Sequence, residues 1–185
     1  MSINPYAPPT AVVADITSPE AVTAEPPFFA VSVAKLAVMS VCTFGLYQLY
    51  WFYKNWERIA DRDRASVWPL TRAIFAVVYC YPCFVRIRDD EGASQLDSQL
   101  KPLPLAIGFI ATSVAWRLPE PWNWISASSF LFLLPVQSYV NRLNALARPS
   151  HDRNSRISGW NWAAVVIGGG LMLLVVAGVL LGSRA

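Results

Sequence analysis

The chain has 185 residues, of which 55% are hydrophobic and 15% charged, and its formal net charge is +3. That balance lies outside the usual range of soluble domains and favours a membrane protein. The three cysteines are an odd number placed inside hydrophobic runs, which excludes a disulfide framework as the basis of the fold.

Residues 1–27 form a Pro-rich acidic segment without a single Lys or Arg. Such a composition cannot bury enough apolar surface to offset the entropy of ordering, so we predict a disordered tail. The segment also lacks the basic start and short apolar core of a secretory signal peptide, and we expect it to be retained.

Charge-poor hydrophobic runs over residues 28–182 predict an all-α membrane domain with four transmembrane helices, followed by a short tail at 183–185. About 20 apolar residues are needed to cross the roughly 30 Å hydrocarbon core. The expected spans are 28–53, 102–118, 122–140 and 160–182. The run at 73–85 is shorter and contains Pro82, so we expect a re-entrant or interfacial segment there.

The distribution of Lys and Arg predicts the orientation, because short loops rich in these residues stay in the cytoplasm. If residues 73–85 do not cross, an outside amino terminus leaves every basic residue in the cytoplasm except Lys35, Arg117 and Arg184. If they do cross, the basic residues divide almost equally between the two sides. We therefore expect the amino terminus outside, with Lys35 near the outer end of its helix, where it can snorkel.

The stretch TFGLYQLYWFYKNW, Thr43 to Trp56, has aromatic rings at half of its positions. Tyr and Trp prefer the level of lipid headgroups, so we expect this stretch at the cytoplasmic end of the first span. A platform for nucleic-acid bases is less favoured, because such a site needs a basic groove and residues 43–53 carry no positive charge.

The segment KLAVMSVCTFGLYQLYWFYKNWERI resembles a family of uncharacterised bacterial multi-pass integral membrane proteins. Their hallmark is a Thr-x-Gly-x-Tyr-x-x-Tyr-Trp-x-Tyr run that closes the first transmembrane helix, here Thr43, Gly45, Tyr47, Tyr50, Trp51 and Tyr53. The stretches LPVQSYVNRLNA and NSRISGWNW are similar to further blocks of the family. The resemblance implies a bacterial inner-membrane location and carries no activity with it.

Candidate catalytic groups are few. The CYPC motif, Cys80 to Cys83, has the spacing of a redox pair, which needs its first thiol at a helix amino terminus. Here the first thiol ends an apolar run, so ordinary packing is favoured over redox chemistry, and two thiols with one distant His do not complete a metal site. The only histidine, His151, stands between Ser150 and Asp152 in a loop, whereas a catalytic triad is assembled from distant positions. We expect neither an enzyme nor a cofactor or metal.

The segments QLYWFYKN and QSYVNRLN place amide side chains at matching offsets near the cytoplasmic ends of two spans. On a helix, residues spaced at i, i+4 and i+7 share one face. The amides are Gln48, Asn55, Gln137, Asn141 and Asn144, and the basic residues Lys54, Arg58 and Arg142 flank them. Such a face can bond helices together, or it can form a vestibule that binds an anionic lipid headgroup or a partner's peptide.

The last expected span contains Gly168, Gly178 and Gly182. Small residues spaced four apart let helix backbones approach closely. We expect this helix to pack tightly inside the bundle or to form a homo-oligomer.

These expectations lead to a non-enzymatic membrane protein that acts by binding membrane lipids or another protein, with no nucleic-acid partner. Accessory, regulatory and protective roles are compatible with it, including that of an immunity partner of a membrane-targeting toxin. The alternative is a small channel or carrier whose pathway uses the Gln/Asn face. That alternative is weakened because ion-coupled transporters generally use an embedded ionisable group, and the expected spans contain no Asp or Glu.

Overall fold

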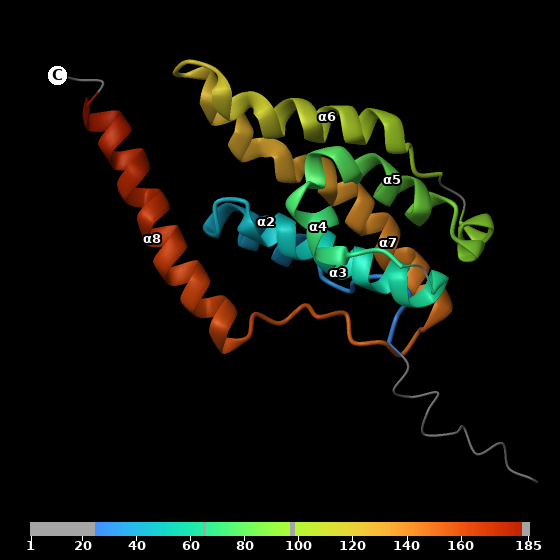
Figure 1. The fold of residues 1–185 in the computed structure, drawn as a ribbon. Coiled ribbons are helices and arrows are strands. Elements are labelled where there is room, and N and C mark those ends of the chain that lie inside the picture. Colours follow the sequence, from blue (N-terminus) through green and yellow to red (C-terminus); the bar gives the residue numbers. More distant parts are fainter. Residues whose placement is uncertain (1–24, 65, 97–98, 183–185) are drawn as a thin grey trace, which may run out of the picture.

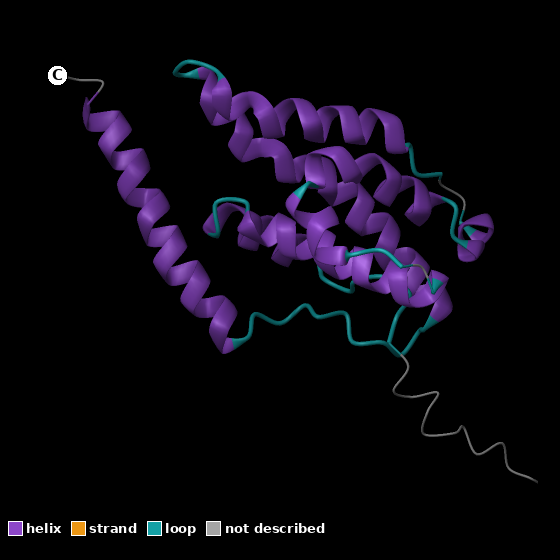
Figure 2. Ribbon diagram, in the orientation of Figure 1, coloured by secondary structure: helices purple, strands orange, loops and turns teal. Residues whose placement is uncertain are grey.

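The computed structural model describes residues 25–64, 66–96 and 99–182, and within these ranges every regular element is a helix (Figure 1, Figure 2). The expected all-α fold class is confirmed for this part of the chain. The elements are α2 (Val33–Cys42), α3 (Leu46–Asp63), α4 (Pro69–Ile74), α5 (Ala76–Arg88), α6 (Pro102–Val114), α7 (Leu133–Ala147) and α8 (Gly159–Gly182), with 3-10 helices η1 (Glu91–Gln95), η2 (Ala115–Arg117) and η3 (Trp122–Phe132). The tail expected at 183–185, and that at 1–27 up to residue 24, lie outside the described residues.

A helical hairpin, α2 followed by α3, replaces the single helix expected over 28–53. Phe44 and Gly45 have positive φ values of 50° and 87°, and the Gly45 N–H donates to the Ser40 carbonyl at 2.9 Å. A left-handed residue of this kind ends a helix, and glycine adopts it without steric cost. The chain then reverses, so that the ring of Phe29, which precedes α2, contacts the ring of Tyr50 in α3 at 5.5 Å.

The apolar run at 73–85 is divided between α4 and α5, which meet at Phe75. Phe75 has φ −94° and ψ 38°, which is outside the helical region, and the chain bends there. Pro82 lies inside α5, and the helix continues on both sides of it. Both helices pack against α3, and neither is long enough by itself to cross a bilayer.

The runs expected to span at 102–118 and 122–140 form a second hairpin. Its first arm is α6 continued by η2, and its second is η3, which leads directly into α7. The arms are tightly apposed, because a β-carbon at Gly108 would overlap the ring of Phe132. Glycine at this position therefore allows α6 and η3 to lie side by side (Figure 1).

Aromatic side chains from the stretch at 43–56 form much of the core. Trp51, Phe52 and Trp56 are fully buried, and the Phe52 ring lies 5.3 Å from that of Phe109 in α6 and 6.1 Å from that of Phe84 in α5. The stretch was expected to be an interfacial belt, but four of its seven rings are buried. Their burial joins α3, α5 and α6 through one apolar cluster.

The last helix, α8, stands beside the bundle and touches it mainly through α2 (Figure 1). It is the one helix among the described residues that is long and apolar enough to cross a membrane, over Asn161–Val179. Most of its large side chains are exposed, including Leu173 at 73% and Leu174 at 71%.

The two ends of the bundle differ in chemistry. Chain reversals gather at one end, where exposed apolar side chains surround them: Phe44, Leu46, Ile74, Val77, Trp116 and Trp124. We call this the apolar end. The opposite end, where α3 and α5 finish, carries ion pairs made by Arg58, Arg62, Asp63, Arg86 and Asp90 with one another and with Glu25. We call this the charged end.

Candidate functional site

An extended segment, residues 28–31, lies buried between α3 and α7. Phe28 and Val31 are fully buried, and neither their backbone groups nor those of Phe29 belong to a helix. A buried backbone group without a partner costs as much as a lost hydrogen bond, so this segment needs donors and acceptors from its neighbours. Four amide side chains supply them: Asn55 of α3, with Gln137, Asn141 and Asn144 of α7. We call these four residues the amide clamp.

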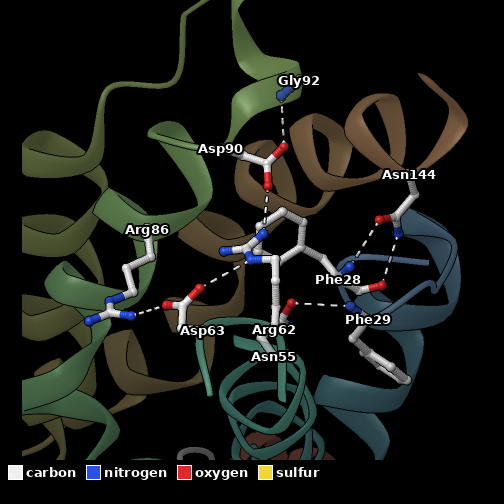
Figure 3. Close-up of polar contacts among 9 residues, drawn as sticks. All are labelled: Phe28, Phe29, Asn55, Arg62, Asp63, Arg86, Asp90, Gly92 and Asn144. Carbon is white, nitrogen blue, oxygen red and sulfur yellow. Dashed lines mark hydrogen bonds and ion pairs between the residues drawn. The ribbon is translucent and has the colours of Figure 1, made fainter. Parts of the chain in front are cut away.

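Asn144 pairs with Phe28 as a neighbouring strand would (Figure 3). Its Oδ1 accepts from the Phe28 N–H at 3.1 Å, and its Nδ2 donates to the Phe28 carbonyl at 3.0 Å. On the other side, the Oδ1 of Asn55 accepts from the Phe29 N–H at 3.3 Å (Figure 3). The Asn55 Nδ2 donates to the Trp51 carbonyl one turn earlier at 2.9 Å, which fixes the orientation of the amide.

Gln137 lies at the centre of the amide clamp and is fully buried. Its Nε2 donates to the carbonyls of Phe29 at 3.2 Å and Val31 at 3.0 Å, and its Oε1 accepts from the Trp51 indole at 2.5 Å. The Nδ2 of Asn141 also donates to the Val31 carbonyl, at 3.0 Å. Each amide of α7 thus binds the backbone of the protein's own segment.

Gln48 and the basic residues expected around the amides lie elsewhere. Gln48 faces the apolar end and accepts a hydrogen bond from Ser129 at 3.2 Å. Arg142 lines a separate groove with Gln99 and Lys101. The structure therefore brings together four of the five expected amides and separates the fifth. Lys54 pairs with Glu57 and Arg58 with Glu25, so that acidic neighbours already offset both charges.

Ion pairs at the charged end close over the start of the extended segment. Arg62 donates to Asp90 at 2.5 Å while its guanidinium lies 4.9 Å from the centre of the Phe28 ring (Figure 3). Arg86 pairs with Asp63, which neighbours Arg62 (Figure 3). These contacts join α3, α5 and η1 around Phe28.

Two acidic groups at this end have altered pKa values. The hydrogen bond from Lys54 holds the pKa of Glu57 below its ordinary value, and the Arg88 guanidinium does the same for Asp89. Both carboxylates stay ionised and paired with a cation, which is the usual arrangement of a surface ion pair. Neither has the raised pKa of a general acid.

A cavity of about 520 Å³ opens at the apolar end, between the α2–α3 turn, α5, α6, η3 and α8. Its lining is mainly apolar, with an amide and four hydroxyls: Gln48, Ser40, Ser113, Ser126 and Ser129. Ser40 is 2% exposed, and its hydroxyl has no hydrogen-bond partner in the described chain. The cavity was not expected from the sequence, although the serines on otherwise apolar helices are a signal for it.

The cysteines and the histidine show no catalytic arrangement. Cys80 and Cys83 are both free and fully buried, and the Cys80 thiol lies 3.5 Å from the Val77 carbonyl. His151 places its Nδ1 2.6 Å from the Arg148 carbonyl in the loop after α7. Within the described ranges, no group of three His, Cys, Asp or Glu residues could hold a metal ion.

Gly168 and Lys35, both singled out in the sequence, make specific contacts in the structure. Gly168 lies directly against the backbone of Cys42, whereas a β-carbon at Gly178 would meet no atom within 4 Å. Gly182 is the last residue of α8. Lys35, expected to snorkel at the outer end of a span, is buried and donates at 2.8 Å to Asn154 Oδ1 and to the Arg156 carbonyl.

Comparisons of the chain with family models, with curated proteins and with solved structures found no match. The geometry of the amide clamp, of the charged end and of the cavity is therefore the basis for the functional conclusion.

Proposed function

We propose that the protein is an integral membrane protein of the bacterial inner membrane that acts by binding a lipid or protein partner and performs no chemistry itself. The observation that carries this proposal is the exposed apolar surface of α8. In water, a helix with Leu173, Leu174 and Leu181 all about 70% exposed would be a large apolar patch. In a bilayer, acyl chains cover it. The resemblance carried by the Thr43–Tyr53 motif agrees with this location.

The apolar end of the bundle supports insertion of more than α8. Exposed Phe44, Ile74 and Trp116 lie far from the ion pairs of the charged end, as expected if the apolar end enters the bilayer and the charged end stays at its surface. We place the charged end in the cytoplasm, because short basic loops remain there.

The hairpin geometry favours a different orientation of the amino-terminal segment from the one expected from charge alone. Glu25 pairs with Arg58, and Phe28 lies under Arg62, so residues on both sides of the α2–α3 hairpin share the charged end. We therefore propose that α2 and α3 enter and leave the membrane on the cytoplasmic side. Lys35 then belongs to the same side, in agreement with its bonds to the loop before α8.

The amide clamp supports a binding role over a channel. A pathway along the Gln/Asn face would need that face to be open, and its amides bind the backbone of residues 28–31 instead. The cavity at the apolar end, by contrast, is open and has polar groups within it. We therefore favour binding at the cavity over flux along the amide face.

Two measurements on the full chain test the proposal. After expression in bacteria, the protein should stay in the membrane pellet on extraction with alkaline carbonate, and its release into the supernatant would contradict membrane insertion. In proteoliposomes the purified protein should give no flux of ions or small solutes above that of empty vesicles. Saturable flux would favour the channel.

A further inference from the structure

We propose that the cavity at the apolar end binds a neutral long-chain lipid, with a hydroxyl or ester carbonyl group held by Gln48. The inference rests on the proposed membrane location and specifies the ligand. Three observations carry it: a polar group that lacks a partner, the neutral lining, and a rim that opens toward the bilayer.

One polar side chain in the cavity, Gln48, has hydrogen-bonding capacity that a ligand can use. Gln48 accepts from Ser129 through its Oε1, and no hydrogen bond joins its Nε2 to another described residue. The hydroxyl of Ser40, a residue that also lines the cavity, is unpaired within the described chain, but its oxygen is fully buried and is not open to a ligand. A polar group without a partner in an apolar cavity is unfavourable, so a ligand oxygen that accepts from the Gln48 Nε2 would relieve it. A carbonyl or hydroxyl oxygen has a lone pair that can accept this hydrogen bond.

The uncharged lining of the cavity favours a ligand group without a charge. No Asp, Glu, Lys, Arg or His is among the described residues that line the cavity. A phosphate or carboxylate placed there would lose its hydration without gaining a counter-charge, which is strongly unfavourable. The bound group is therefore neutral, and anionic headgroups are excluded from this site.

The apolar side chains around the cavity opening indicate the route by which a lipid enters. Leu46, Ile74 and Trp116 line the cavity and are each about 60% or more exposed, so that the opening is surrounded by apolar side chains. In the proposed orientation this rim lies within the bilayer, where a lipid can enter sideways with its chain still among other acyl chains. The volume of about 520 Å³ falls within the roughly 300–1,000 Å³ usual for ligand sites, enough for the polar group and the start of one chain.

The test uses the full chain in nanodiscs and a monoacylglycerol with a photoreactive diazirine near its ester. Irradiation followed by mass spectrometry should locate the label on residues that line the cavity. Gln48→Leu removes a hydrogen bond and should weaken labelling roughly two- to tenfold. Ala127→Trp fills the opening from an exposed position and should abolish labelling.

Matched controls separate the site from general lipid contact. Gln95→Leu, at an exposed position on η1, and Leu173→Trp, on the lipid-facing side of α8, should label like the parent protein. Unlabelled monoacylglycerol should compete, and phosphatidylglycerol should not. Labelling spread along α8 and unchanged in Ala127→Trp, or equal competition by the anionic lipid, would overturn the proposal. Because carbonate extraction reports insertion separately, a membrane-inserted protein without cavity labelling would reject this inference alone.

Discussion

Gly168 in α8 lies so close to Cys42, at the end of α2, that a β-carbon at position 168 would overlap the Cys42 carbonyl oxygen. Any other residue must push α8 away from the hairpin. Because α8 touches the bundle mainly through α2, this contact determines where the long apolar helix sits.

A disulfide test follows from the neighbouring glycine. A β-carbon at Gly169 would lie 3.7 Å from the Cys42 sulfur, which brings the thiol of a cysteine at this position within reach of the Cys42 thiol. Gly169→Cys, in a background with Cys80 and Cys83 replaced by Ala, should therefore form an intramolecular disulfide on mild oxidation, seen as a gel shift. Gly170→Cys, which has nothing within 4 Å, should not, and adding Gly168→Leu should reduce the yield. Equal cross-linking at both glycines would contradict the packing of α8 on α2.

Replacement of Asn144 by Leu should destabilise the protein strongly. The change leaves both the N–H and the carbonyl of Phe28 buried without partners, at a cost of about 1–3 kcal/mol for each group. We expect the Tm in detergent to fall by roughly 5 °C or more. Asn161→Leu, at a half-buried site on α8, provides the matched control and should change the Tm little. A similar loss in both variants would mean that the amide clamp is not the cause.

Cysteines placed at Pro26 and Ala93 test the orientation. In the proposed arrangement both positions belong to the charged end, so in a protein without its native cysteines both should be shielded from an impermeant thiol reagent added outside intact cells. Both should react once the membrane is permeabilised. Labelling of the Pro26 site alone would restore an outside amino terminus and would mean that α2 and α3 do not form a hairpin in the membrane.

The pair formed by Lys54 and Glu57 predicts a small acid sensitivity. Because the pKa of Glu57 is lowered in the folded protein, the pair stabilises the fold above the ordinary Glu pKa of about 4.3 and loses this effect as pH falls through the lowered pKa. The effect should not exceed about 1 kcal/mol, since the pair is partly exposed. Denaturation of the parent and of Glu57→Gln at pH 7 and pH 3 measures it. A stability difference that does not shrink at pH 3 would contradict the assignment.

Apolar runs and prolines were enough to predict the helical fold and one of its reversals. The expected spans 102–118 and 122–140 imply a reversal between them, and Pro119 and Pro121 lie there because proline ends helices and leaves few conformations open. The reversal at Gly45 was missed, since a single glycine between apolar residues is equally common inside a membrane helix. The short apolar helix α2, the three linking residues and the apolar first half of α3 therefore have the same composition as one long span.

The amide face was found from helical spacing, but its partner was not. Spacing shows that Gln137, Asn141 and Asn144 share a face, and it says nothing of what faces them. The partner is the backbone of residues 28–31, which is more than a hundred residues away in the chain.

The separation of 116 residues between Phe28 and Asn144 has a consequence for biosynthesis. During translation, the amino-terminal segment leaves the ribosome long before α7 exists, so its backbone must stay hydrated or be held by another factor until the second half of the protein is made. A nascent chain that stops before α7 would expose an unpaired edge at Phe28–Val31. The docking of this segment therefore waits until α7 has been synthesised, so the buried amino-terminal backbone is among the last parts of the bundle to be completed.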